Sequence, residues 1–152
     1  MNARTPVVTA ASSPRAQGGE GAVTALSILL LLQAVFALAV TIFLSLLAGD
    51  QRSAIGGEAG IAAENATRFA AGGAILFAIL AYVASRGARR RRSWSWTLGA
   101  VLQLILAVAA GIAMIVAGAS GLTAAYLVAF GLAAVTMLLL STSAVRQALG
   151  QA

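Results

Sequence analysis

Long apolar runs, separated by short polar or charged segments, dominate this chain. No charged residue occurs from Thr24 to Ala48, which corresponds to about 37 Å of helix at 1.5 Å per residue. A helix of that length crosses the ~30 Å hydrocarbon layer of a bilayer with some tilt. The apolar region of a cleaved signal peptide is shorter, about 7–15 residues. We therefore interpret this run as a retained membrane span.

Three further apolar runs follow, so spans are expected at about 24–48, 66–85, 96–118 and 122–140. Backbone groups inside lipid must be satisfied within the segment, which predicts a helix for each span. Only "ASG" separates the last two runs, and so short a link predicts an antiparallel hairpin. The pattern thus predicts an all-α integral membrane protein, a four-transmembrane-helix bundle with antiparallel neighbours.

Polar segments flank the predicted transmembrane domain, which we place at 23–145. Residues 1–22 are small, polar and rich in Gly and Pro, a composition typical of a disordered tail. Residues 146–152 are expected to form a second short tail. The loop between spans 1 and 2 contains Glu64 and Arg68 four positions apart, a favourable spacing for a helical pair. We therefore expect span 2 to continue as helix for a turn or two beyond the membrane.

Composition supports a membrane location and excludes functional sites that need cysteine or histidine. The 152-residue chain is 61% hydrophobic and 9% charged, with a mean hydropathy of +0.95. Soluble domains carry about 25% charged residues, so most of this surface is expected to face lipid. The absence of cysteine excludes disulfides and thiolate sites. Histidine, the commonest metal ligand, is also absent.

The distribution of arginine predicts how the bundle is oriented. An even number of spans puts both termini and the loop between spans 2 and 3 on one side. Eight of the ten basic residues fall on that side: Arg4, Arg15, Arg86, Arg89, Arg90, Arg91, Arg92 and Arg146. The other side holds Arg52 and Arg68, with three of the four acids. Because cytoplasmic loops carry the excess of Lys and Arg, we expect both termini to be cytoplasmic, in the cell membrane.

The segment "RGARRRRSWSW" is expected to anchor the bundle at the cytoplasmic face. Clustered arginines beside a membrane attract anionic headgroups, and tryptophans favour the membrane–water interface. We do not expect nucleic-acid binding, because the loop is short and no folded platform stands behind it. The residues predicted to set topology and to contact lipid headgroups are Arg86, Arg89, Arg90, Arg91, Arg92, Trp94 and Trp96.

Spans 1 and 3 each contain one glutamine on a face with small residues. Gln33 lies about nine residues into span 1, and Gln103 lies about seven residues beyond Trp96 in span 3. Both positions fall in the inner half of the bilayer, within about one helical turn of the same depth. We expect the two side chains to face the bundle interior and to share an interhelical hydrogen bond, which acts as packing glue. A role in a pore or substrate path is the alternative.

Catalytic, cofactor and metal sites are not expected. No Asp, Glu, Lys, Arg or His occurs in the central part of any span, whereas ion-coupled transporters usually place such a residue there. Ser27 and Ser45 lack a candidate base. The outer acids Asp50, Glu58 and Glu64 are irregularly spaced, which makes a cation site a weak hypothesis. A lipid-modifying enzyme would need acids at the cytoplasmic face, where Glu20 alone is available.

The arginine-rich loop running into "WTLGAVLQLILAVAAG" resembles a pattern in small four-span integral membrane proteins of high-GC actinobacteria. The resemblance covers about half of the chain, and those proteins mostly lack an assigned activity, so it implies no functional residues. We expect a non-enzymatic accessory or interaction subunit of a membrane complex, in contact with membrane lipids and with a membrane-protein partner or further copies of itself. The alternative is an oligomeric channel or transporter subunit, with a path lined by Gln33, Thr41, Ser45 and Gln103.

Overall fold

The computed structural model describes residues 14–117 and 123–151, which form helices joined by short turns. Their order is α1 (Pro14–Ile55), α2 (Gly57–Arg89), α3 (Trp94–Ala117), α4 (Thr123–Ser141) and the short α5 (Ser143–Ala148). Within this part of the chain, four helices are long and apolar enough to cross a membrane. The protein is therefore all-α with four candidate membrane spans, packed as antiparallel neighbours, as the apolar pattern predicts.

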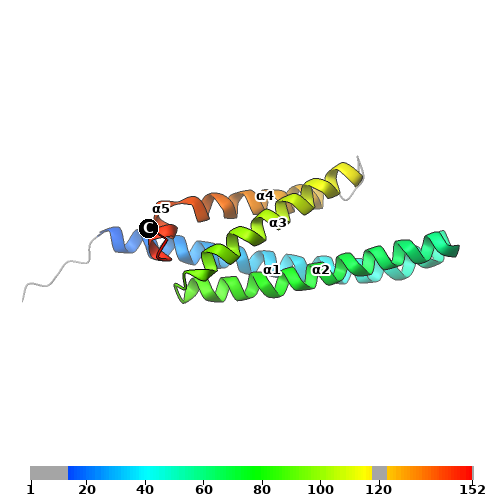
Figure 1. Cartoon of the computed structure of the whole chain (residues 1–152), viewed down its shortest axis with the longest axis horizontal. Helices are drawn as coiled ribbons and strands as arrows, with labels where there is room; N and C mark the ends of the chain where they lie inside the picture. The colour runs from blue at the N-terminus through cyan, green and yellow to red at the C-terminus, as the bar shows by residue number, and fades with distance from the viewer. Residues whose placement is uncertain (1–13, 118–122, 152) are drawn as a thin grey trace, which may run out of the picture.

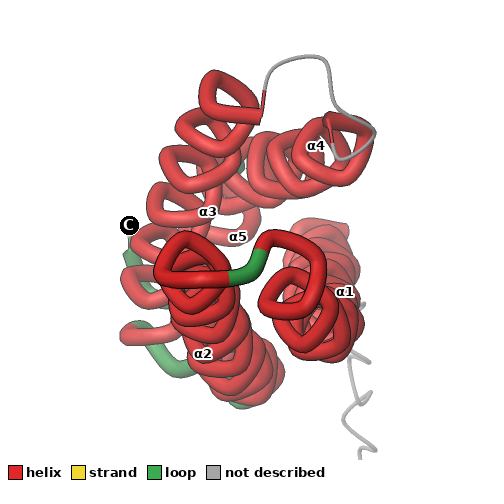
Figure 2. Tube along the Cα trace, turned by 90° about the vertical axis from the view of Figure 1, so that its right-hand side faces the viewer, coloured by secondary structure: helices red, strands yellow, loops and turns green. Residues whose placement is uncertain are grey.

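The four long helices form two antiparallel hairpins. Figure 1 shows α1 and α2 lying together along their length, while α3 crosses them at an angle and returns as α4. Figure 2, which looks onto the end with the α1–α2 turn, shows α1 and α2 as one pair and α3 and α4 as the other. The start of α1, the α2–α3 loop and α5 all lie at the opposite end of the molecule (Figure 1).

The hydrophobic core lies toward the end with the α2–α3 loop. Leucines of α1, alanines of α2 and single leucines of α3 and α4 make up most of it, together with residues from the C-terminal segment: Leu26, Leu30, Ala34, Ala81, Ala84, Ala88, Leu102, Leu140, Val145 and Leu149. Small alanines on α2 let α1 approach closely, which is how membrane helices pack when lipid removes the hydrophobic force between them. Most large apolar side chains elsewhere on the spans are exposed, as expected for a surface that faces lipid.

The segment between spans 1 and 2 is helical on both sides of a single turn, rather than a loop of about twenty residues. α1 continues to Ile55, and α2 begins at Gly57. The turn uses Gly56 and Gly57, whose φ angles of 69° and 59° lie in the left-handed region that glycine adopts without steric cost. The predicted helical extension of span 2 is present, and it is longer than a turn or two.

Both predicted tails are partly helical. The prediction of a disordered tail over residues 1–22 is wrong for residues 14–22, because α1 begins at Pro14; residues 1–13 lie outside the described part of the chain. Proline is favoured at the first helical position because its missing N–H has no intrahelical partner there. At the other end, α5 packs against α1, and Val145 of α5 and Leu149, which directly follows it, are buried. The four-residue spacing of these two apolar side chains is the sequence feature that could have indicated this short helix.

Candidate functional site

A buried polar cluster joins three of the membrane-spanning helices. Gln33 of α1 donates through Nε2 to Oε1 of Gln103 in α3 at 3.0 Å, and Gln103 Nε2 donates back to Gln33 Oε1 at 2.9 Å. Gln33 Nε2 also donates to the hydroxyl of Thr136 in α4 at 3.1 Å. All three side chains are at most 2% exposed. The structure thus brings the two glutamines together and adds a third partner.

Thr136 closes this cluster because its hydroxyl acts as acceptor and donor at once. It accepts from Gln33 and donates to the backbone carbonyl of Leu132, one turn earlier in α4, at 2.7 Å. Every buried side-chain nitrogen and oxygen in the described residues has a hydrogen-bond partner. An amide buried without partners is costly in an apolar medium, so this mutual satisfaction is what permits two glutamines inside the bundle.

A second polar cluster connects α1 and α2 near the α2–α3 loop. The hydroxyls of Ser27 and Ser85 lie 3.0 Å apart, and Ser85 Oγ donates to the Ser27 carbonyl at 2.9 Å. Both serines are buried. Arg89 then donates through Nε to Ser27 Oγ at 2.7 Å, which fixes one edge of its guanidinium group. Sequence reasoning missed this contact, because small serines on two helices gave no spacing signal of their own.

The α2–α3 loop forms around a C-terminal cap of α2. The Arg92 N–H bonds to the Gly87 carbonyl at 3.1 Å and the Arg91 N–H to the Ala88 carbonyl at 2.9 Å, the two bonds of a Schellman motif. This motif puts Arg91 in the left-handed region, with φ 51°. Glycine is the usual residue there, and a side chain costs about 1–2 kcal/mol. Arg91 therefore occupies its position against the backbone preference.

The two tryptophans at the start of α3 make contacts with other helices. Trp94 packs over Gly87 so closely that a Cβ on Gly87 would lie 2.7 Å from the Trp94 Cη2 atom. Trp96 donates through its indole N–H to the Leu140 carbonyl of α4 at 3.0 Å. The loop is therefore pinned to α2 by one tryptophan and to α4 by the other.

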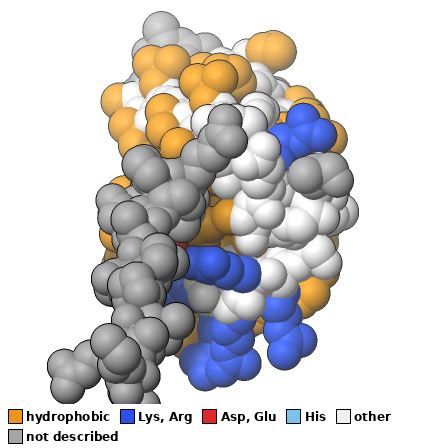
Figure 3. All heavy atoms as spheres, turned by 90° about the vertical axis from the view of Figure 1, so that its left-hand side faces the viewer, with side chains coloured by type: hydrophobic (Ala, Val, Ile, Leu, Met, Phe, Trp, Pro, Cys, Tyr) orange, Lys and Arg blue, Asp and Glu red, His pale blue; other side chains and the backbone are white. Residues whose placement is uncertain are grey.

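The arginines predicted to contact headgroups are all exposed at this end of the molecule: Arg86, Arg89, Arg90, Arg91 and Arg92. Basic side chains gather on this face in Figure 3. Two of the five make side-chain contacts among the described residues: Arg89 with Ser27, and Arg91 with Glu20 of α1 at 2.8 Å. The loop is thus tied to α1 by one hydrogen bond and one exposed ion pair.

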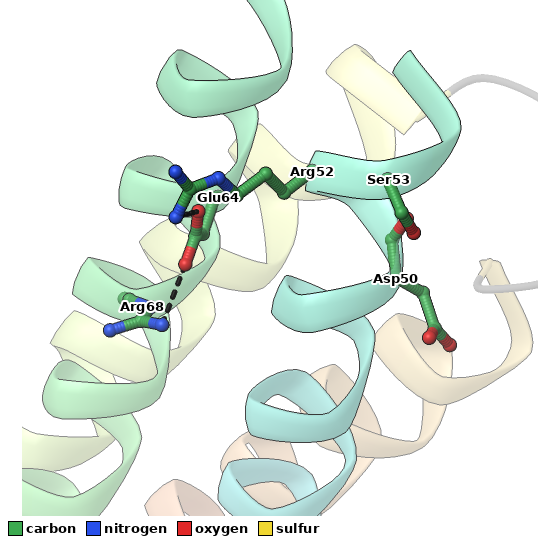
Figure 4. Close-up of polar contacts among 5 residues, drawn as sticks. All are labelled: Asp50, Arg52, Ser53, Glu64 and Arg68. Atoms are coloured by element: carbon green, nitrogen blue, oxygen red, sulfur yellow. Dashed lines mark hydrogen bonds and ion pairs between the residues drawn. The ribbon is translucent and has the colours of Figure 1, made fainter. Parts of the chain in front are cut away.

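A third polar cluster braces the opposite end of the α1–α2 hairpin (Figure 4). The Glu64 carboxylate lies 2.6 Å from Arg68 on its own helix and 3.6 Å from Arg52 on α1. Its side chain is only 9% exposed, because α1 covers it. Thr67 of α2 also donates to Gln51 of α1 at 2.7 Å. The predicted Glu64–Arg68 pair is present, and Arg52 makes it a link between two helices.

Asp50 and Glu58 do not join Glu64 to form a cation site. In Figure 4 Asp50 points away from Glu64, and the Glu64 carboxylate faces two guanidinium groups. In the described residues no group of three or more His, Cys, Asp or Glu side chains lies close enough to hold a metal ion. The chemistry of the observed clusters is hydrogen bonding and charge pairing between helices.

Comparisons with known proteins do not assign this chain to a family. The four-helix architecture of the sequence resemblance is present, but nothing supports the actinobacterial lineage. Searches against protein-family models, curated proteins and solved structures return no match.

Proposed function

We propose that this chain is a non-enzymatic interaction subunit of the cell membrane, in which the four-helix bundle holds a rigid helical hairpin outside the membrane for contact with a partner protein. The observation that carries the proposal is the continuation of α1 and α2 as paired helices beyond their charge-free stretches, up to the turn at Gly56. Figure 1 shows these two helices reaching past the ends of α3 and α4.

The length of the projecting hairpin follows from where the charges begin. The charge-free part of α1 ends at Gly49, and that of α2 begins at Phe69. Beyond these charge-free stretches, the six residues of α1 from 50 to 55 extend about 9 Å and the twelve residues of α2 from 57 to 68 about 18 Å. Isolated helices of this length are marginal in water, so the hairpin depends on contacts between its two helices. The Glu64–Arg52 ion pair and the Thr67–Gln51 hydrogen bond supply such contacts.

The positive-inside rule supports an orientation for this hairpin. The start of α1, the α2–α3 loop and α5 share one end of the molecule, and that end carries the arginine cluster. Placing this end in the cytoplasm puts the hairpin turn on the other side of the membrane. The hairpin then presents Ile55 and Ile61, both about half exposed, to water rather than to lipid.

The bundle interior supports an interaction role over a channel. Gln33 and Gln103 are the strongest candidates for lining a polar path, and the two amide groups form hydrogen bonds with each other. Thr41 and Ser45 donate to carbonyls of their own helix, at 2.9 Å and 2.8 Å. The two glutamines therefore link α1 to α3, and the two hydroxyls are bonded within α1. A path between copies of the chain would need another set of polar groups on the outer surface, where the spans are mainly apolar.

Site-specific photo-crosslinking in native membranes tests the proposal. A photoreactive residue replaces Ile61 on the hairpin or, as a control, Ile112, which is exposed on α3 within its apolar run. We expect one discrete adduct with a different membrane or exported protein at position 61 and none at position 112. The variant Ile61→Arg should then lose co-purification of that protein while the bundle keeps its thermal stability.

Other results would count against the interaction role. An adduct with the mass of two identical chains, combined with solute flux through the reconstituted protein, would support the channel alternative. Equal labelling at positions 61 and 112 would mean that the hairpin has no preferred partner.

A further inference from the structure

An open hollow lies between α1 and the end of α2, beside the arginine loop. Its volume is ≈ 490 Å³, and its lining combines apolar and charged side chains: Glu20, Val23, Thr24, Ile28, Arg89 and Arg91. The apolar part comes from α1, and both guanidinium groups come from the end of α2. Figure 3 looks onto this end of the molecule, where the basic side chains gather.

A hydrogen bond to α1 fixes the orientation of the Arg89 guanidinium group. Its Nε donates to the buried Ser27 hydroxyl, which is itself bonded to Ser85 of α2. Guanidinium carries five N–H donors in a fixed planar fork, and this bond uses one of them. The fork matches the geometry of a phosphate group, which accepts two parallel N–H bonds.

Arg91 reaches the same hollow from a backbone position that favours glycine. It occupies the left-handed site of the Schellman motif at the end of α2. A side chain kept at such a position against the backbone preference points to a function for that side chain. Its present partner is Glu20, and both members of this ion pair are more than half exposed. An exposed pair of this kind is weak, so a phosphate that Arg89 binds at the same time can displace the Glu20 carboxylate from Arg91.

The apolar surface below the hollow indicates that the ligand carries an acyl chain. The charge-free part of α1 begins at Gly21, next to the lining residues Val23 and Thr24, so the hollow lies at the depth of the headgroups. Ile28, Leu32 and Val35 lie on one face of α1 below it, and each is more than half exposed. A phosphate bound by Arg89 and Arg91 would therefore have an apolar track directly beneath it.

From this arrangement we infer that the hollow is a binding site for one anionic phospholipid, whose phosphate is held by Arg89 and Arg91 and whose acyl chain lies along Ile28, Leu32 and Val35. Glu20 occupies Arg91 in the absence of lipid and tunes the affinity of the site. The remaining arginines of the loop supply a general attraction to an anionic surface. This site is independent of the partner contact proposed for the distant hairpin.

Lipid titration of the full-length protein tests the inference. The protein in a non-ionic detergent is titrated with dioleoyl phosphatidylglycerol, and the one-lipid adduct is followed by native mass spectrometry. We expect a saturable first adduct that dioleoyl phosphatidylcholine, at the same concentration, populates much less. Arg89→Gln and Arg91→Gln should each weaken the first adduct about fivefold. Glu20→Gln, which releases Arg91, should strengthen it.

Matched variants distinguish binding at a specific site from general attraction by the positive charge of the loop. Arg90→Gln and Arg92→Gln remove the same charge from the same loop but do not line the hollow, so each should change the affinity less than twofold. Arg91→Gly distinguishes an effect on lipid binding from an effect on folding, because glycine adopts the left-handed backbone conformation without steric cost. Its thermal stability should be equal or higher, while the lipid adduct weakens as in Arg91→Gln. Equal losses for Arg90→Gln and Arg91→Gln would overturn the inference.

A second comparison distinguishes a lipid from free phosphate. Ile28→Ser should weaken the phosphatidylglycerol adduct, because the acyl chain loses part of its track. Inorganic phosphate at millimolar concentration should not displace the lipid. Full displacement by phosphate together with no effect of Ile28→Ser would identify the hollow as a site for small anions and overturn the assignment to a phospholipid.

Discussion

Gln33 and Gln103 bind each other through two hydrogen bonds of 3.0 Å and 2.9 Å, in which each amide nitrogen donates to the oxygen of the other. The two residues are seventy positions apart in sequence and belong to different hairpins. Their pairing therefore joins the α1–α2 hairpin to the α3–α4 hairpin inside the membrane. Together with the Gln33–Thr136 hydrogen bond, it holds the two halves of the bundle in register.

Replacing one glutamine should cost more stability than replacing both. Gln103→Leu leaves the Gln33 amide buried with Thr136 as its remaining side-chain partner, whereas Gln33→Leu/Gln103→Leu removes both amides together. Hydrogen bonds between membrane helices contribute about 0.6–2 kcal/mol, so we expect a loss in that range for each single variant. The double variant should recover part of it. Unfolding in mixed detergent micelles measures the difference, and simple additivity of the two single losses would contradict a coupled pair.

Gly87 should tolerate no larger residue, since Trp94 covers it. Gly87→Ala introduces a Cβ that would lie 2.7 Å from Trp94 Cη2 and 3.0 Å from Ser95 Cβ. Overpacking of this kind costs about 1–3 kcal/mol, and the indole ring must move. Tryptophan fluorescence and thermal stability should both change. Gly72→Ala, in the same helix with nothing within 4 Å, is the control: it should leave the fluorescence unchanged and the stability equal or higher, because alanine favours the helix over glycine.

Removing the Glu64 carboxylate should loosen the projecting hairpin without unfolding the bundle. Glu64→Gln loses the ion pairs with Arg52 and Arg68, whose guanidinium groups are mostly exposed, so we expect a cost of about 1 kcal/mol. Amide hydrogen exchange in residues 50–68 should accelerate, while exchange in the buried part of α3 stays the same. Glu58→Gln, which removes an exposed carboxylate from the first turn of α2, should accelerate this exchange less. Equal exchange in the two variants would show that the brace does not stabilise the hairpin.

Single-cysteine labelling should report the orientation directly, because the natural chain contains no cysteine. Glu58→Cys lies near the hairpin turn and Ser93→Cys lies in the arginine loop, and both positions are exposed. In intact cells a membrane-impermeant maleimide should label Glu58→Cys only, and lysis should make Ser93→Cys reactive. The reverse pattern would place the arginines outside and remove the basis for the proposed orientation.

A polar contact could be predicted from the sequence where its residues stand out in an apolar run or follow helical spacing on one element. Gln33 and Gln103 stand out because a primary amide in a long apolar run has to find a partner, and their depths match. Glu64 and Arg68 follow helical spacing on a single element. Thr136 and Arg52 could not be found in this way. Each is a common residue on a separate helix, and its contact depends on the rotation of that helix about its own axis.

The pattern of apolar runs by itself determined the number of candidate spans, their helical form and the common end shared by the start of α1, the arginine loop and the C-terminal segment. A backbone in lipid must form its hydrogen bonds within its own segment, and the length of each apolar run can be read directly from the sequence. Only the tertiary structure decided that α1 and α2 continue to Gly56, that α5 packs back on α1, and that Arg89 and Arg91 meet Glu20 around one hollow. These features depend on how helices rotate and cross, which is set by contacts between residues far apart in sequence.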